Sequence, residues 1–79
     1  MMARTQAQFN QALEDAIRRS GMTNRNYWIV PTFIGYYAAM EKPEAHTLPA
    51  GTEAVEVNAA GKTLGSIKSV RQVKRGFPE

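Results

Sequence analysis

The sequence predicts an α+β fold, in which an N-terminal amphipathic helix packs on a small antiparallel sheet of about three strands that includes a C-terminal hairpin. Three observations support this prediction: helical spacing of apolar residues near the N-terminus, an apolar and aromatic run in the middle, and a turn between two β-rich segments near the end. The chain has 79 residues. Since domains typically have about 100–150 residues, we expect a single domain with one thin core.

The first predicted element is a helix over residues 5–20. Its apolar residues follow one helical stripe: Phe9, Ala12, Leu13, Ala16 and Ile17. Thr5 and Gln8 match a capping box, in which each side chain accepts a hydrogen bond from the other's backbone N–H. Gly21 predicts the left-handed residue that ends the helix, and Met22 is then expected to pack back against the last turn.

Residues 27–40 are almost wholly apolar or aromatic, and we interpret them as a strand that is covered on both faces. Pro31 cannot donate to a strand ladder, so it indicates an edge, a bulge or a break, and Gly35 indicates a second kink. A helix that begins at Thr32 and stops at Pro43 is the alternative interpretation. Gly35 and the two tyrosines after it disfavour that helix.

Residues 54–58 and 62–68 predict a β-hairpin, because they flank a turn in which Gly61 is free to adopt positive φ. The apolar residues of 66–75 recur at every third position, so a short helix there is an alternative. We favour a hairpin arm that ends near residue 68, followed by a basic C-terminal tail over residues 69–79.

The composition excludes several classes of chemistry. The chain has no cysteine and one histidine, which excludes disulfides, thiolate metal sites, cysteine nucleophiles and any two-histidine metal site. His46 is the one candidate general base, and Glu44 lies two residues before it. We interpret His46 as a surface residue, because no second group is predicted to converge on it. We therefore expect a protein that is not an enzyme and that binds no cofactor and no metal.

Hydropathy gives an expectation about location. No apolar run approaches the about 18 residues that span a bilayer. The first ten residues also lack the apolar segment of a signal peptide. We therefore expect a cytoplasmic protein that does not associate with a membrane.

Charge is distributed unevenly along the chain, which has a net charge of +3. Residues 27–61 are mostly acidic among their charged positions, whereas residues 62–79 are mostly basic. A basic segment of this kind could contact nucleic-acid phosphates, each contact adding salt-dependent affinity. The candidate contacts are Lys68, Arg71, Lys74 and Arg75.

Aromatic residues are concentrated in the middle of the chain. We expect Trp28, Phe33 and Ile34 to lie in the core of so small a domain. Tyr36 and Tyr37 are adjacent, so in a strand their side chains point to opposite faces and one of them points outward. Tyrosine and tryptophan dominate the hot spots of protein interfaces. The candidate partner-binding residues are Tyr36, Tyr37 and Trp28, together with the four cations named above.

These observations favour a small non-catalytic protein that binds a macromolecule. Our working hypothesis is a protein-binding inhibitor or adaptor, such as a bacteriophage or mobile-element protein that blocks a host complex. The alternatives are a nucleic-acid-binding module that uses the basic C-terminal segment, and a structural subunit of a larger assembly such as a virion. A homo-oligomer is a further expectation, because a single small core supplies only about 3–5 kcal/mol.

Overall fold

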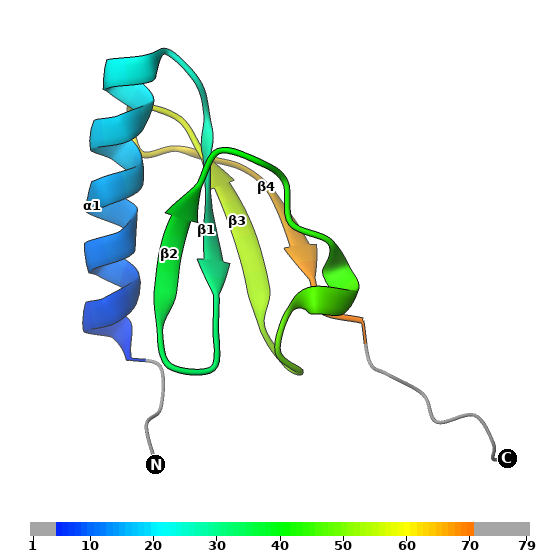
Figure 1. Ribbon diagram of the computed structural model, residues 1–79. Coiled ribbons are helices and arrows are strands. Elements are labelled where there is room, and N and C mark those ends of the chain that lie inside the picture. The colour runs from blue at the N-terminus through cyan, green and yellow to red at the C-terminus, as the bar shows by residue number, and fades with distance from the viewer. Residues whose placement is uncertain (1–4, 71–79) are drawn as a thin grey trace, which may run out of the picture.

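The computed structural model describes residues 5–70, and its fold is α+β, as the sequence predicts (Figure 1). One helix, α1 (Gln6–Thr23), packs on a four-stranded antiparallel sheet. The strands are β1 (Tyr27–Pro31), β2 (Tyr36–Ala39), β3 (Glu53–Val57) and β4 (Thr63–Lys68), and a 3-10 helix, η1 (Ala45–Thr47), lies between β2 and β3. The strand order is β2-β1-β3-β4, so β2 and β4 are the edge strands.

The start of α1 is the predicted capping box. The Gln8 backbone N–H donates to the Thr5 hydroxyl oxygen at 3.1 Å, and the Thr5 backbone N–H donates to the Gln8 side-chain oxygen at 2.9 Å. Two N–H groups at the start of the helix are therefore satisfied by side chains that are close in sequence.

The end of α1 differs from the prediction. The left-handed residue is Asn24, with φ of 63°, and its N–H donates to the Ser20 carbonyl at 2.9 Å. Gly21 stays inside the helix, which costs only about 1 kcal/mol relative to alanine. Met22 is 76% exposed and does not pack back onto the helix. The prediction for Gly21 and Met22 is therefore wrong, because asparagine also tolerates the left-handed conformation and allows the helix to continue to it.

Residues 27–40 form two strands and a tight hairpin, rather than one strand. The chain reverses between Thr32 and Gly35, where the Thr32 N–H donates to the Gly35 carbonyl at 2.7 Å. The sheet consequently has four strands, where the sequence predicts about three. The alternative helix that would begin at Thr32 does not form, because this segment turns back and pairs with β1.

Pro31 fits this hairpin because it is the last residue of β1. It lies opposite Tyr36 in β2, while the ladder between β1 and β3 ends earlier, at the pair of Ile29 and Val55. A proline at the end of a strand interrupts no central ladder, so the missing N–H is tolerated here.

The second hairpin, β3–β4, confirms the predicted turn. The Gly61 N–H donates to the Asn58 carbonyl at 2.9 Å, and Gly61 adopts positive φ of 82°. The strand continues to Lys68, as we favoured for this segment. Residues 66–70 are therefore not helical, and the rest of the alternative helix and of the predicted tail, which begins at residue 71, lies outside the described residues.

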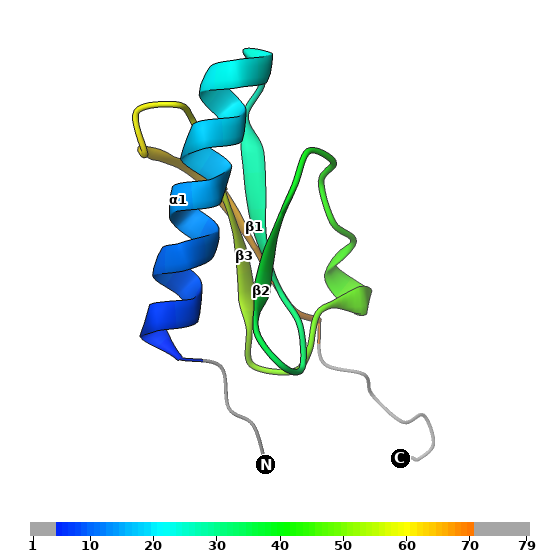
Figure 2. The same ribbon diagram turned by 60° about the vertical axis from the view of Figure 1, so that its left-hand side comes forward.

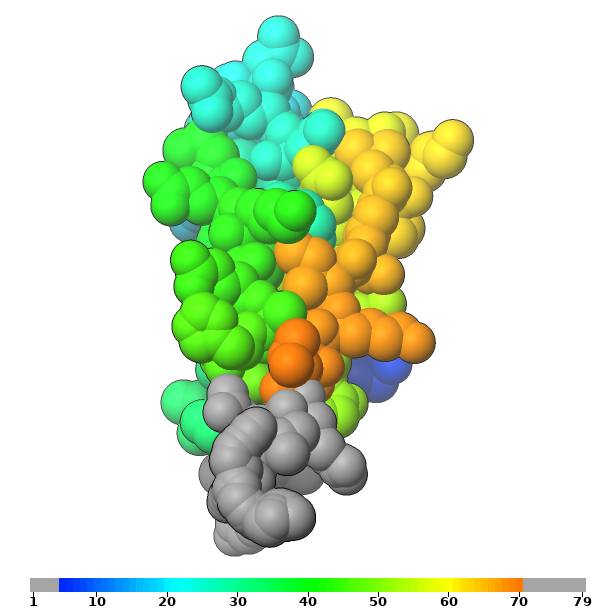
Figure 3. All heavy atoms as spheres, turned by 90° about the vertical axis from the view of Figure 1, so that its right-hand side faces the viewer, coloured from blue at the N-terminus to red at the C-terminus, as the bar shows by residue number. Residues whose placement is uncertain are grey.

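Two layers cover the sheet, one on each face (Figures 1 and 2). α1 packs over β1 and β2, and the core on this side contains Ala12, Ala16, Tyr27, Ile29 and Val57. The loop that carries η1 covers the other face, where the core contains Trp28, Val30, Leu48 and Ala54. Figure 3 shows this loop beside β4 on the face opposite α1. All five residues of β1 are buried, which confirms that this strand is covered on both faces.

No helix within residues 5–70 is long and apolar enough to cross a bilayer.

Candidate protein-binding site

The most exposed large apolar side chains of the sheet lie at the turn between β1 and β2. Phe33 is 78% exposed and Ile34 is 68% exposed, and we call these two residues the hairpin tip. The expectation that both lie in the core is wrong. A two-residue turn projects its side chains beyond the end of the sheet, so neither layer that covers the sheet reaches them.

Thr32 holds the backbone of the hairpin tip through its side chain. Its hydroxyl oxygen accepts hydrogen bonds from the N–H groups of Ile34, at 3.3 Å, and Gly35, at 3.0 Å. The same hydroxyl lies 3.2 Å from the Gly35 carbonyl, to which it donates. A threonine in this position imitates a backbone turn, so the chain reverses without the Asn-Gly pair that usually marks a two-residue hairpin.

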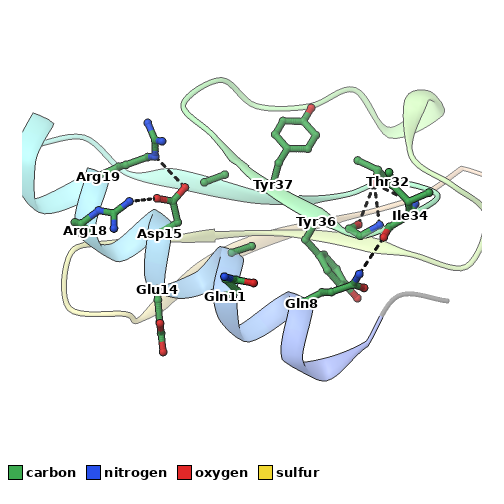
Figure 4. Close-up of a pocket in the computed structure, with 13 residues that line it drawn as sticks. Gln8, Gln11, Glu14, Asp15, Arg18, Arg19, Thr32, Ile34, Tyr36 and Tyr37 are labelled. Atoms are coloured by element: carbon green, nitrogen blue, oxygen red, sulfur yellow. Dashed lines mark hydrogen bonds and ion pairs between the residues drawn. The ribbon is translucent and has the colours of Figure 1, made fainter. Parts of the chain in front are cut away.

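Gln8 connects the hairpin tip to the start of α1. Its side-chain amide donates to the Ile34 carbonyl at 3.1 Å (Figure 4), while its oxygen accepts from the Thr5 N–H. The tip is thus fixed from both sides, by Thr32 within the turn and by Gln8 from the helix. A surface that is already ordered loses less conformational entropy when a partner binds it.

The two adjacent tyrosines point to opposite faces of β2, as the alternation predicts (Figure 4). Tyr36 is half-buried beside α1, where its ring lies edge-on to the ring of Phe9 with centroids 5.3 Å apart. Tyr37 is 50% exposed. This result confirms the expectation that one of the pair points outward, and it leaves Tyr37 as the accessible member.

Trp28 does not suit a partner-binding role. Its side chain is 8% exposed and packs with Val30, Leu48 and Ala54 in the core beneath the η1 loop. The expectation that Trp28 belongs to the core is therefore confirmed, and its ring is closed to a partner in this conformation.

An open groove of about 810 Å³ runs between α1 and β2. Tyr36, Tyr37 and Ala38 line it from the strand. The charged residues that line it from the helix are Glu14, Asp15, Arg18 and Arg19. Asp15 forms ion pairs with both arginines, with 2.9 Å separating its carboxylate from the Arg19 Nε (Figure 4). The two acidic and two basic side chains balance, so the groove carries no net charge.

The predicted cations are not brought together with the tyrosines. Lys68 is exposed at the end of β4, opposite Glu53 in the ladder. β4 and β2 are opposite edges of the sheet, about 14 Å apart at the usual strand spacing. The other candidate cations, Arg71, Lys74 and Arg75, lie outside the described residues.

His46 is a surface residue, as the sequence predicts. Its ring is 63% exposed, and its Nε2 lies 3.3 Å from a carboxylate oxygen of Glu44, which is also exposed. Over the described range, no group of three or more histidine, cysteine or acidic side chains is arranged to hold a metal ion.

Sequence reasoning missed the hairpin tip, although one signal for it is present. Thr32 and Gly35 bracket the two tip residues between two β-rich segments, which is the spacing of a two-residue hairpin.

The chain matches no protein-family model, no curated protein and no solved structure in the comparisons made with it.

Proposed function

We propose that this protein is a non-catalytic protein-binding module that inserts its hairpin tip into an apolar pocket of a partner protein. The observation that carries the proposal is the exposure of Phe33 and Ile34 on a turn that Thr32 and Gln8 hold in place. An apolar pair that is exposed in the free protein gains most when a partner covers it.

The energy available from the tip suits a binding hot spot. Complete burial of a phenylalanine or isoleucine side chain contributes about 1.5–3 kcal/mol each. Loss of the pair would then weaken binding by at least about tenfold, since 1.4 kcal/mol corresponds to about a factor of ten in affinity. Such an effect would place both residues among the few that dominate an interface.

An inhibitor or adaptor in the cytoplasm is the role that we assign to such a module. A protein that acts by covering a surface of its target needs a rigid contact and no catalytic group. This role also fits a bacteriophage or mobile-element protein that blocks a host complex. The identity of the protein captured in the experiment below tests that hypothesis.

The test compares the double variant F33S/I34S with the control M22S in affinity capture from a lysate of the host cell. Met22 is 76% exposed at the far end of α1, so M22S removes a similar exposed apolar group away from the tip. We expect wild type and M22S to capture the same protein, and F33S/I34S to capture at least tenfold less. Because all three positions are exposed, thermal unfolding should be almost unchanged in both variants.

Two results would contradict the proposal. The first is equal capture by F33S/I34S and wild type, which would place the contact elsewhere on the surface. The second is loss of every captured protein after nuclease treatment. That result would favour the nucleic-acid alternative, in which the basic segment that begins near Lys68 makes the contact.

A further inference from the structure

β2 is an edge strand whose outer side has free hydrogen-bonding groups. Within the described chain, β2 pairs with β1 alone. The Thr32 N–H bonds the Gly35 carbonyl, so the alternation of an antiparallel ladder directs the backbone groups of Tyr37 and Ala39 toward β1. The same alternation directs the N–H and C=O groups of Tyr36 and Ala38 outward, where they are available to another strand.

The edge of β2 lacks the features that usually prevent strand pairing. Its sequence, Tyr-Tyr-Ala-Ala, contains no charge, no proline and no glycine, and its ladder with β1 has no bulge. The opposite edge is different, because β4 ends in Lys68 and its ladder is shifted beside Glu56 and Val57. Natural sheets protect their edges with charges and bulges of this kind, so β2 is the unprotected edge.

We propose that two copies of this chain pair antiparallel through β2 and form a two-fold symmetric dimer with one continuous eight-stranded sheet. The two-fold axis passes at Tyr37, so that Tyr36 lies opposite Ala38 of the second copy. The outward N–H and C=O groups of Tyr36 and Ala38 then bond across the interface. This proposal concerns a surface other than the hairpin tip and does not depend on it.

The side chains of β2 are complementary to themselves in this register. On the face toward α1, the large Tyr36 lies beside the small Ala38 of the second copy. On the other face, Tyr37 lies opposite its own equivalent in a non-hydrogen-bonded pair, where Cα atoms are only about 4.5 Å apart. Cross-strand aromatic pairs are favourable, and no like charges are opposed.

The helices also fit this arrangement. α1 packs against β1 and β2 on one face of the sheet, and a two-fold axis perpendicular to the sheet places both helices on that face. The groove between α1 and β2 then faces its own equivalent in the second copy, and its balanced charges oppose no excess of like charge.

A cysteine substitution at the two-fold axis tests this dimer, because the natural chain has no cysteine. A non-hydrogen-bonded pair places the two Cα atoms within the range that a disulfide spans. We expect Y37C under mild oxidation to form a covalent dimer of twice the 8.8 kDa chain mass. L64C is the matched control for random collision, since Leu64 is 45% exposed on the other edge strand.

Sedimentation equilibrium of the wild-type chain and of Y37K completes the test. We expect wild type to be dimeric at micromolar concentration, L64K to remain dimeric, and Y37K to weaken dimerisation at least tenfold because it opposes two like charges at the axis. Three results would each overturn the proposal. They are a monomeric wild-type chain, equal crosslinking of Y37C and L64C, and an L64K variant that dissociates while Y37K remains dimeric. A wild-type monomer that loses a captured protein on Y37K substitution would instead assign β2 to a strand of another protein.

Discussion

Replacement of Thr32 by valine tests whether this side chain holds the hairpin tip. Thr32→Val keeps the branched shape and removes the hydroxyl, which forms three hydrogen bonds of 3.0–3.3 Å within the turn. Each such bond contributes about 0.5–1.5 kcal/mol net, and the low end applies because water can reach a partly buried turn. We therefore expect a loss of about 1–1.5 kcal/mol, which lowers the melting temperature of a domain of this size by roughly 4–12 °C.

Two measurements check this prediction. Thermal unfolding followed by circular dichroism gives the stability change, and amide hydrogen exchange gives the local effect at Ile34 and Gly35. Faster exchange at these two amides is expected, with little change in the middle of β1. Thr63→Val, at an exposed threonine that begins β4, is the matched control. Unchanged exchange at both amides and an unchanged melting temperature would refute the role of Thr32 in fixing the tip.

Three further predictions concern stability, each measured by urea unfolding. Gln8→Ala removes the acceptor at the helix start and the bond to the Ile34 carbonyl, so we expect a loss of about 1–2 kcal/mol; a midpoint equal to that of the exposed control Gln11→Ala would contradict this. Ile29→Ala empties a fully buried position and should lower the free energy of unfolding by about 2–5 kcal/mol, enough to unfold much of the protein. A variant as stable as wild type would show that burial of this side chain does not stabilise the fold. Asn58→Ala removes the side-chain oxygen that accepts two backbone N–H groups of the second turn, so we expect a loss of about 1 kcal/mol, and an unchanged midpoint would argue against it.

The parts of the fold that the sequence predicts are those with local causes. The start of α1 depends on Thr5 and Gln8, three residues apart, which satisfy each other's backbone groups. The β3–β4 turn depends on Gly61, whose conformation suits a residue without a side chain. In both cases the residues that decide the structure lie within a few positions of one another, so their pattern is visible in the sequence.

The division of residues 27–40 could not be predicted in the same way. Its turn contains Phe33 and Ile34, two residues that local preference assigns to a strand. The reversal depends on the Thr32 hydroxyl and on Gln8, which is 26 residues away from Ile34 in the sequence. The Gln8 contact is long-range and leaves no local pattern, so the spacing of Thr32 and Gly35 is the one signal of this turn in the sequence.

The candidate site shows the same contrast. Alternation along β2 is enough to predict that one of Tyr36 and Tyr37 is exposed. The sequence also predicts that Trp28 belongs to the core, but it does not predict what covers the ring, because the η1 loop brings Leu48 over the sheet from twenty residues further along the chain. The exposure of the tip follows from the turn itself, so it became visible only with the fold.

The contact of the hairpin tip with a partner protein can be measured directly by photocrosslinking in the host cell. A photoreactive benzoylphenylalanine at position 33 keeps the aromatic character of Phe33, and the same residue at position 22 serves as the control on an equally exposed side chain. We expect one dominant crosslinked protein from position 33, which is absent from position 22 and is the protein captured by wild type. A crosslink from position 22 to that protein, with none from position 33, would contradict it.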